Sequence, residues 1–202
     1  MNRVAIVMAI TGLLTTVSPA LARDDDHRDK DNKFATRLSG YNEVHFSGGG
    51  GAVLPVPGAT LRGAVSTKAR GKFEAKLDKG GDVIYYELSY EGLEGIVTQG
   101  HIHFGQQHTV GGIVVWLCQT ATNPAPPPVT DPKITPICPT EGSVKGTITA
   151  GQVLAQTLQG IEAGEFDELV RALRAGAAYA NVHSSLHGPG EIRGQIKVVD
   201  RD

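Results

Sequence analysis

The chain has 202 residues, of which 40% are hydrophobic and 20% charged, and its formal net charge is -2. These values are ordinary for a soluble globular protein. The 21 acidic residues outnumber the 19 basic ones, so no nucleic-acid partner is expected, because nucleic-acid binders carry a clustered basic surplus. With 26 glycines, 11 prolines and 5% aromatic residues, the composition favours short strands joined by turns over a helical bundle.

The N-terminus has the pattern of a secretory signal peptide, predicted over residues 1–22. Arg3 supplies the positive charge, residues 4–14 form a short apolar run, and Ala20-Leu21-Ala22 is a cleavage site of the A-x-A type. Retention of this segment as an N-terminal anchor is the alternative. No later run approaches the roughly 20 apolar residues of a membrane helix. We therefore expect a periplasmic or secreted protein whose mature form has no membrane span.

Residues 23–33 are mostly charged and include nothing apolar to bury. This composition predicts a disordered, solvated tail. A folded domain is predicted after it, over residues 34–199.

Within this domain, apolar residues alternate with period two, as expected for strands with one buried face. The clearest case is the run in which Ile84, Tyr86, Leu88 and Tyr90 share a face. Strands are predicted over residues 72–77, 83–90, 97–104, 143–149, 178–184 and 191–198. Residues 113–117 are apolar throughout, which predicts a central strand. Glycine-rich residues 48–51 and the Pro55–Gly58 stretch are predicted turns.

Cys118 and Cys138 flank a proline-rich segment. Its prolines prevent it from forming a regular helix or a central strand. In an oxidising compartment these cysteines are expected to form a disulfide. Closing this loop would stabilise the fold by roughly 3 kcal/mol. Two free buried thiols are the alternative.

One segment has a helical period, because Phe166, Leu169, Val170 and Leu173 recur at i, i+3, i+4 and i+7 and Gly176 follows as a stop. The predicted fold class is therefore all-β: a Greek-key β-sandwich or barrel with one short inserted α-helix near the C-terminal end.

Three histidines form the candidate site. His101 and His103 lie two residues apart in a predicted strand, so both imidazoles leave the same face. His183 is the expected third ligand. His108, in the loop after the strand that carries His101 and His103, is a candidate fourth ligand. Imidazoles without a thiolate suit copper or zinc, and Asn181 is a candidate for orienting the rings. The alternative is that the histidines only make structural hydrogen bonds.

Two further histidines, His45 and His187, are predicted to be exposed loop residues outside this site. Glu43 and Glu191 are not expected to form an acid/base pair, since Glu191 is more simply explained as part of a charged strand face.

Four stretches together resemble the CHRD (chordin) domain family over about residues 34 to 198. They are Phe34–Glu43, Gly100–Gly105, Gly176–Ser184 and Gly190–Ile196. The resemblance implies an extracytoplasmic β-sandwich domain, related in animals to a secreted antagonist of growth factors. It implies no established enzyme activity.

A more distant likeness is to the copper/zinc superoxide dismutase fold, also a Greek-key sandwich. On that likeness, His101 and His103 match the paired copper ligands and His183 matches the late one. The sequence departs from the family elsewhere, because the loop after His103 offers only His108 and no carboxylate for zinc. Arg193 falls on the wrong strand alternation to match the family's active-site arginine.

Two functional classes follow from the sequence. The first is an exported binding or structural module of the cell envelope or extracellular space, whose partner is an unidentified protein or envelope component contacted through Tyr41, the 48–51 turn and the proline-rich loop. The second is a copper-binding metalloprotein that uses His101, His103 and His183. No catalytic residue is assigned and a non-enzymatic role is favoured, since superoxide turnover also needs electrostatic guidance of the anion.

Overall fold

The computed structural model of the chain describes residues 32–47 and 60–199. The predicted signal peptide, most of the predicted tail and the two predicted turns between residues 48 and 58 lie outside this part. The strands are β1 Lys33–Ser39, β2 Val44–Ser47, β3 Thr60–Gly63, β4 Arg70–Leu77, β5 Ile84–Glu91, β6 Val97–Phe104, β7 Gly112–Cys118, β8 Gly142–Ile148, β9 Ala178–Ser184, β10 Ile192–Gln195 and β11 Lys197–Val198. The α-helix is α2, Phe166–Arg174, and short 3-10 turns are η1 Gly40–Asn42, η2 Ala150–Gln152 and η3 Thr157–Gln159.

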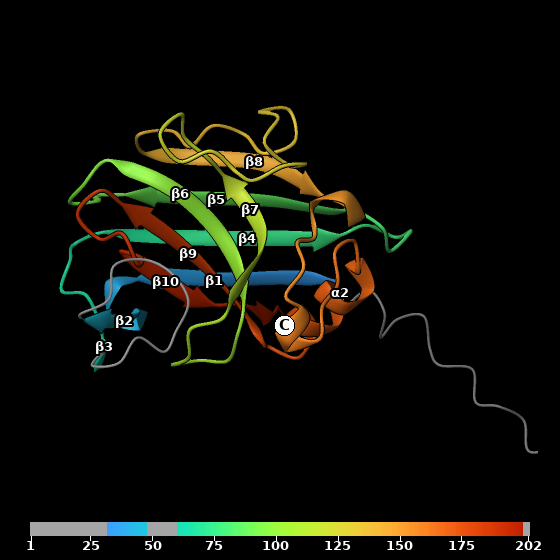
Figure 1. Cartoon of the computed structure of the whole chain (residues 1–202), viewed down its shortest axis with the longest axis horizontal. Helices are drawn as coiled ribbons and strands as arrows, with labels where there is room; N and C mark the ends of the chain where they lie inside the picture. Colours follow the sequence, from blue (N-terminus) through green and yellow to red (C-terminus); the bar gives the residue numbers. More distant parts are fainter. Residues whose placement is uncertain (1–31, 48–59, 200–202) are drawn as a thin grey trace, which may run out of the picture.

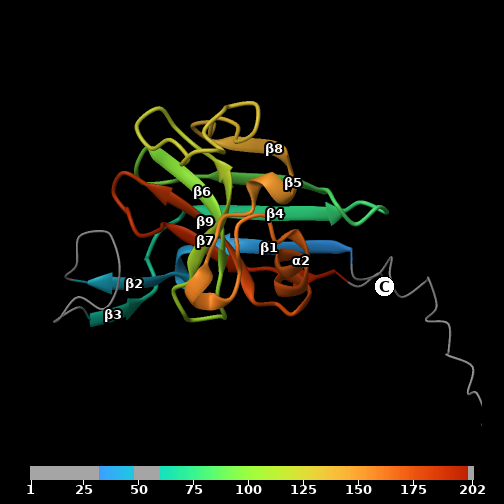
Figure 2. The same ribbon diagram turned by 45° about the vertical axis from the view of Figure 1, so that its right-hand side comes forward.

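The main sheet has the strand order β7-β6-β9-β10-β1-β4-β5-β8, with antiparallel pairing throughout, and β11 pairs with β1. Figure 1 shows β1, β4, β5 and β8 in one layer, crossed obliquely by β6, β7 and β9. The two end strands, β7 and β8, contact each other, so the sheet is a nearly closed barrel or sandwich. The hairpin β2–β3 projects from one side and α2 lies toward the other (Figure 2). The predicted fold class is confirmed.

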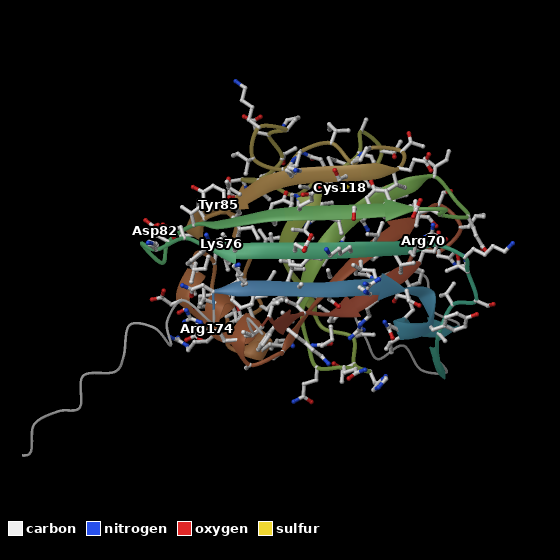
Figure 3. All side chains as sticks on the ribbon, turned by 180° about the vertical axis from the view of Figure 1, so that it is seen from behind. Arg70, Lys76, Asp82, Tyr85, Cys118 and Arg174 are labelled. Atoms are coloured by element: carbon white, nitrogen blue, oxygen red, sulfur yellow. A yellow bond between two sulfur atoms is a disulfide. The ribbon has the colours of Figure 1, made fainter. Side chains whose placement is uncertain are left out.

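Strict alternation identifies the strands that have one face in solvent. In β5 the four predicted core residues are all buried, with Tyr86 the most exposed of them at 4%. The opposite face of this layer is polar: Figure 3 views it from behind, with Arg70 and Lys76 near the two ends of β4 and Tyr85 on β5. Ion pairs on this face, such as Lys72 Nζ to Glu74 Oε1 at 2.7 Å, are largely exposed and contribute little to stability.

The prediction that residues 113–117 form a central strand was wrong, because β7 ends the pairing order. Its residues Val114, Val115 and Leu117 are nevertheless fully buried. The segment after β8 covers this strand: the backbone N–H of Leu154 donates to the Val114 carbonyl at 2.9 Å, and Gln156 Nε2 donates to the Ile113 carbonyl at 2.7 Å. Residues 113–117 are therefore apolar because the segment after β8 covers β7, and not because β7 lies in the middle of the sheet.

Helix α2 forms where the helical period predicted it. Its four periodic apolar residues are buried, and Gly176 follows in the left-handed region at φ +66°. Acidic Asp167 and Glu168 lie in the first turn and basic Arg171 and Arg174 in the last, which suits the helix dipole. None of the helices in the described ranges is both long and apolar enough to cross a bilayer.

Cys118 and Cys138 form a disulfide, as predicted, across a sequence separation of 20 residues. The enclosed segment is irregular and is organised around Gln119. The Gln119 side chain donates to the carbonyls of Thr130 and Thr135 and accepts from the Ala125 backbone N–H, at 2.6 to 2.9 Å. This network lets a proline-rich segment satisfy buried backbone groups without strand pairing.

Loss of this disulfide should lower the free energy of unfolding by about 3 kcal/mol, because the unfolded chain regains the entropy of an open loop. The measurement is urea unfolding of the Cys118→Ser/Cys138→Ser variant beside the oxidised wild type. Wild type unfolded in reductant is the matched control and should shift by a similar amount. An unchanged midpoint in both samples would contradict the expectation.

Candidate functional site

Antiparallel pairing of β6 and β9 brings the three predicted histidines together. Gln99 pairs with His183, and His101 pairs with Asn181. Because side chains alternate, His101, His103 and His183 all leave the outer face of the barrel, whereas Ile102 between them is fully buried on the inner face. The figures show β6 and β9 side by side (Figures 1 and 2).

The three rings converge on one point. His101 Nδ1 lies 3.2 Å from His183 Nε2, and one ring nitrogen from each histidine lies within 4.8 Å of the other two. Two nitrogens bound to a tetrahedral ion at metal distances of 2.0–2.1 Å are about 3.3 Å apart. A small rearrangement of the rings would therefore suffice to hold one transition-metal ion.

Backbone carbonyls fix the protons on two of these rings. Nδ1 of His103 lies 3.0 Å from the Gly111 carbonyl oxygen, and Nδ1 of His183 lies 2.8 Å from that of Gly188. Since a carbonyl only accepts, each Nδ1 carries the proton and donates it, and each Nε2 presents a lone pair. His101 Nδ1–H in turn donates to His183 Nε2. The Nε2 atoms of His101 and His103 are buried without a hydrogen-bond partner.

Burial keeps the rings in the form that binds metals. Desolvation, with a further contribution from the neighbouring His183, lowers the pKa of His103 from 6.5 to about 3. Desolvation likewise holds the pKa of His101 well below its ordinary value. Both imidazoles are therefore neutral at physiological pH, as metal ligation requires.

An aromatic and cationic layer packs beside the cluster. The Tyr179 ring is stacked on His103, with centroids 4.7 Å apart and an interplanar angle of 1°. Arg193 Cζ lies 3.3 Å from the Tyr179 centroid. Trp116 makes an edge contact with His101 at 4.3 Å. The sequence analysis did not match Arg193 to an active-site arginine, because of its position in the strand alternation. In the structure Arg193 pairs with Asn181 on the neighbouring strand and so shares the outer face with the histidines.

The loop of residues 105–111 is held over this layer. Arg193 donates to the carbonyls of Thr109 and Gln106 at 2.7 and 3.1 Å, and the Tyr179 hydroxyl accepts from the Gly111 backbone N–H at 3.2 Å. A Cβ at Gly111 would lie 1.7 Å from the Phe104 carbonyl oxygen, so only glycine permits this close approach. The loop thereby places the carbonyl that orients His103.

Asn181 has a different role from the predicted one. Its Nδ2 donates to Glu43 and to the Ile192 carbonyl, so it bridges the sheet to the segment after β1. Glu43 is buried, and desolvation raises its pKa to about 8, although Arg193 nearby opposes that rise. The ring-orienting groups are instead the backbone carbonyls of Gly111 and Gly188, which no side-chain pattern could reveal.

His108 is not brought into the cluster. It is exposed in the loop, where its backbone has a φ of +65°. Across residues 32–47 and 60–199, the group that converges contains His101, His103 and His183 without it. The structure thus assembles three of the four histidines proposed from the sequence.

A comparison with models of protein families gives a match. The family model of the CHRD domain matches residues 34–196, a range that includes the whole histidine cluster and its supporting loop. No curated protein and no solved structure matches the chain.

Proposed function

The chain belongs to the CHRD domain family, and from this premise we propose that it is an exported module that binds one copper ion through His101, His103 and His183. The observation that carries the proposal is the pair of buried, unpartnered Nε2 atoms on His101 and His103, at the place where these rings converge with that of His183. A buried polar atom left without a partner costs about 1–3 kcal/mol. A bound ion would give His103 Nε2 a partner and would replace the hydrogen bond between His101 Nδ1 and His183 Nε2.

The ligand chemistry favours copper. The cluster offers imidazole nitrogen alone, and for a given nitrogen site the Irving–Williams order places Cu²⁺ above Zn²⁺. The hydrogen bonds from His103 and His183 to backbone carbonyls fix their tautomers, which is the arrangement that supports metal-bound histidines. On His101, binding through Nδ1 would require its proton to move to Nε2.

The proposed role is holding the ion in place. His101 is fully buried, and His103 and His183 are 7% and 5% exposed, so the rings are closely covered by protein. Such a closed cluster suits retention of a metal better than rapid turnover of a substrate. The proposed partner is a protein or a component of the cell envelope. Tyr41, one of the residues predicted to contact it, is 71% exposed and so accessible to a partner.

Export is supported by the disulfide. Disulfides persist in oxidising compartments such as the periplasm and extracellular space, and the Cys118–Cys138 bond is consistent with either location. The signal peptide predicted over residues 1–22 would direct the chain there.

Metal counting tests the proposal. The mature chain, dialysed against copper and against zinc, should retain one copper ion per chain, and the His101→Ala/His103→Ala variant should retain none at that site. His108→Ala is the matched control, because it removes a nearby histidine outside the cluster. His103→Gln, with circular dichroism to verify folding, serves if the double variant does not fold. Wild type without stoichiometric copper would refute the proposal.

A further inference from the structure

A second group of ligating side chains lies at the barrel end where the β5–β6 and β9–β10 loops meet. Glu94 is in the β5–β6 loop, His187 is in the β9–β10 loop, and Glu191 immediately precedes β10. One ligand atom from each lies within 4.8 Å of the other two. The sequence predicted His187 to be an exposed loop residue and Glu191 to be part of a charged strand face, so neither was expected to join a ligand group.

Glu191 is an unusual residue for a structural role. It is fully buried, and its Oε1 accepts from the Glu94 backbone N–H at 2.8 Å and from Thr67 Oγ1 at 2.9 Å. Its Oε2 is also buried but has no hydrogen-bond partner. No lysine or arginine in the described part of the chain forms a salt bridge with it. A buried carboxylate in this setting favours a nearby cation, which would offset its lost hydration.

His187 and Glu94 complete the ligand set. His187 Nε2–H donates to Glu94 Oε2 at 3.1 Å, and their side chains are 24% and 46% exposed. A metal ion bound between these atoms would take the place of the proton on Nε2. The partial exposure leaves a route from solvent and space for a water ligand.

We propose that Glu94, His187 and Glu191 form a second metal site, which binds Zn²⁺. Zinc accepts imidazole nitrogen and carboxylate oxygen together, and three protein ligands plus one water is a coordination that it commonly adopts. The two carboxylates would neutralise the ion. The site differs in chemistry from the all-imidazole cluster, and it stands or falls independently of copper binding there.

The β9–β10 loop links this site to the histidine cluster. Its Gly188 carbonyl accepts from His183 Nδ1 at 2.8 Å, and His187 is the preceding residue. Backbone hydrogen bonds from His187 N–H to the Ser184 carbonyl at 3.2 Å and from Gly190 N–H to the His187 carbonyl at 3.0 Å keep the loop compact. Zinc at the second site would therefore brace the same loop that orients His183.

The test uses metal-free mature protein in the His101→Ala/His103→Ala background, which removes the first site. Zinc titration with counting of bound ions should give one equivalent. Glu191→Gln and Glu94→Gln should each weaken that binding at least about 100-fold, since even outer-shell changes cost 10–100-fold. Glu74→Gln, on an exposed strand face, is the control and should bind as its parent does. If the double-alanine background fails to fold, the same series in the wild type should show the loss of one zinc equivalent.

A second readout separates a metal ligand from a structural carboxylate. Metal-free Glu191→Gln should melt near the temperature of its parent, because the amide oxygen still accepts from Thr67 Oγ1 and from the Glu94 backbone N–H. Zinc should raise the melting temperature of the parent and leave that of Glu191→Gln unchanged. Equal zinc binding by the parent and both glutamine variants would overturn the proposal, as would a parent that binds no zinc.

Discussion

The metal-free protein should be most stable near pH 6.5 and should lose stability on both sides of that value. On the acid side the cause is the buried imidazoles. Between pH 6.5 and about 3 the unfolded chain binds a proton at residue 103 that the folded chain does not, because the folded pKa of His103 is about 3. Its contribution to the free energy of unfolding therefore falls as pH falls, by roughly 5 kcal/mol in full. His101, whose pKa is also lowered by burial, acts in the same direction.

On the alkaline side the cause is Glu43. Burial raises its pKa from 4.5 to about 8, so between these values the folded protein holds a proton that the unfolded chain has released. Its contribution to stability is therefore lost as pH rises through this range. Below pH 6.5 the two histidines outweigh this single carboxyl, and above pH 6.5 the carboxyl acts alone.

Urea unfolding between pH 4 and pH 9, with a chelator present, measures this profile. Glu43→Gln mimics the protonated side chain and should remove the decline between pH 6.5 and 8 while leaving the acid limb in place. Glu74→Gln is the control and should follow the wild type, since Glu74 is exposed in β4. A wild-type profile that stays level from pH 6.5 to 8 would show that Glu43 is ionised in the folded protein.

Replacing Arg193 should weaken both the fold and the copper site. Arg193 is 2% exposed and holds the 105–111 loop through the Thr109 and Gln106 carbonyls. Arg193→Met retains the length of the side chain but removes the Arg193 hydrogen bonds to the Thr109 and Gln106 carbonyls, of which the Gln106 carbonyl still accepts from Thr109. It also removes the cation near Glu43. We expect a loss of about 3 kcal/mol in the free energy of unfolding, typical of breaking a buried polar network.

The same substitution should lower copper affinity roughly 10–100-fold, as is usual when a group supporting a ligand is removed. The path runs through the loop, because Gly111 supplies the carbonyl that orients His103. Affinity is measured by competition with a chelator at a temperature where the variant is folded. Arg37→Met, an exposed position in β1, is the matched control. Unchanged affinity in a destabilised Arg193→Met protein would limit Arg193 to a structural role.

Prediction from sequence succeeded where one face of an element meets solvent. Strand β5 and helix α2 have such faces, so their periods of two and 3.6 are visible in the sequence. Strand β9 is buried at all seven positions, and the position of β7 in the sheet was wrongly predicted because coverage by the segment after β8 also makes a strand apolar. Alternation along one strand was enough to place His101 and His103 on one face, whereas the arrival of His183 depends on the pairing of β6 with β9.

The rest of the site depends on packing between distant segments. Asn181 meets Glu43 across 138 residues, and Arg193 reaches the carbonyl of Thr109 across 84. Neither contact has a local pattern. The carbonyls of Gly111 and Gly188 belong to the backbone, so no side-chain pattern marks them. The grouping of His187 with two glutamates requires the β5–β6 and β9–β10 loops to meet at one end of the barrel.

Strand β9 separates the barrel core, on its inner face, from the histidine cluster, on its outer face. Ala178, Ala180 and Val182 belong to the barrel core, while Tyr179 and His183 belong to the outer cluster. An enlarged inner side chain would push the backbone outward and shift His183 against its neighbours. Tolerance to substitution should therefore be low along the whole strand, including at its small alanines, whereas the solvent face of β5 is open to change.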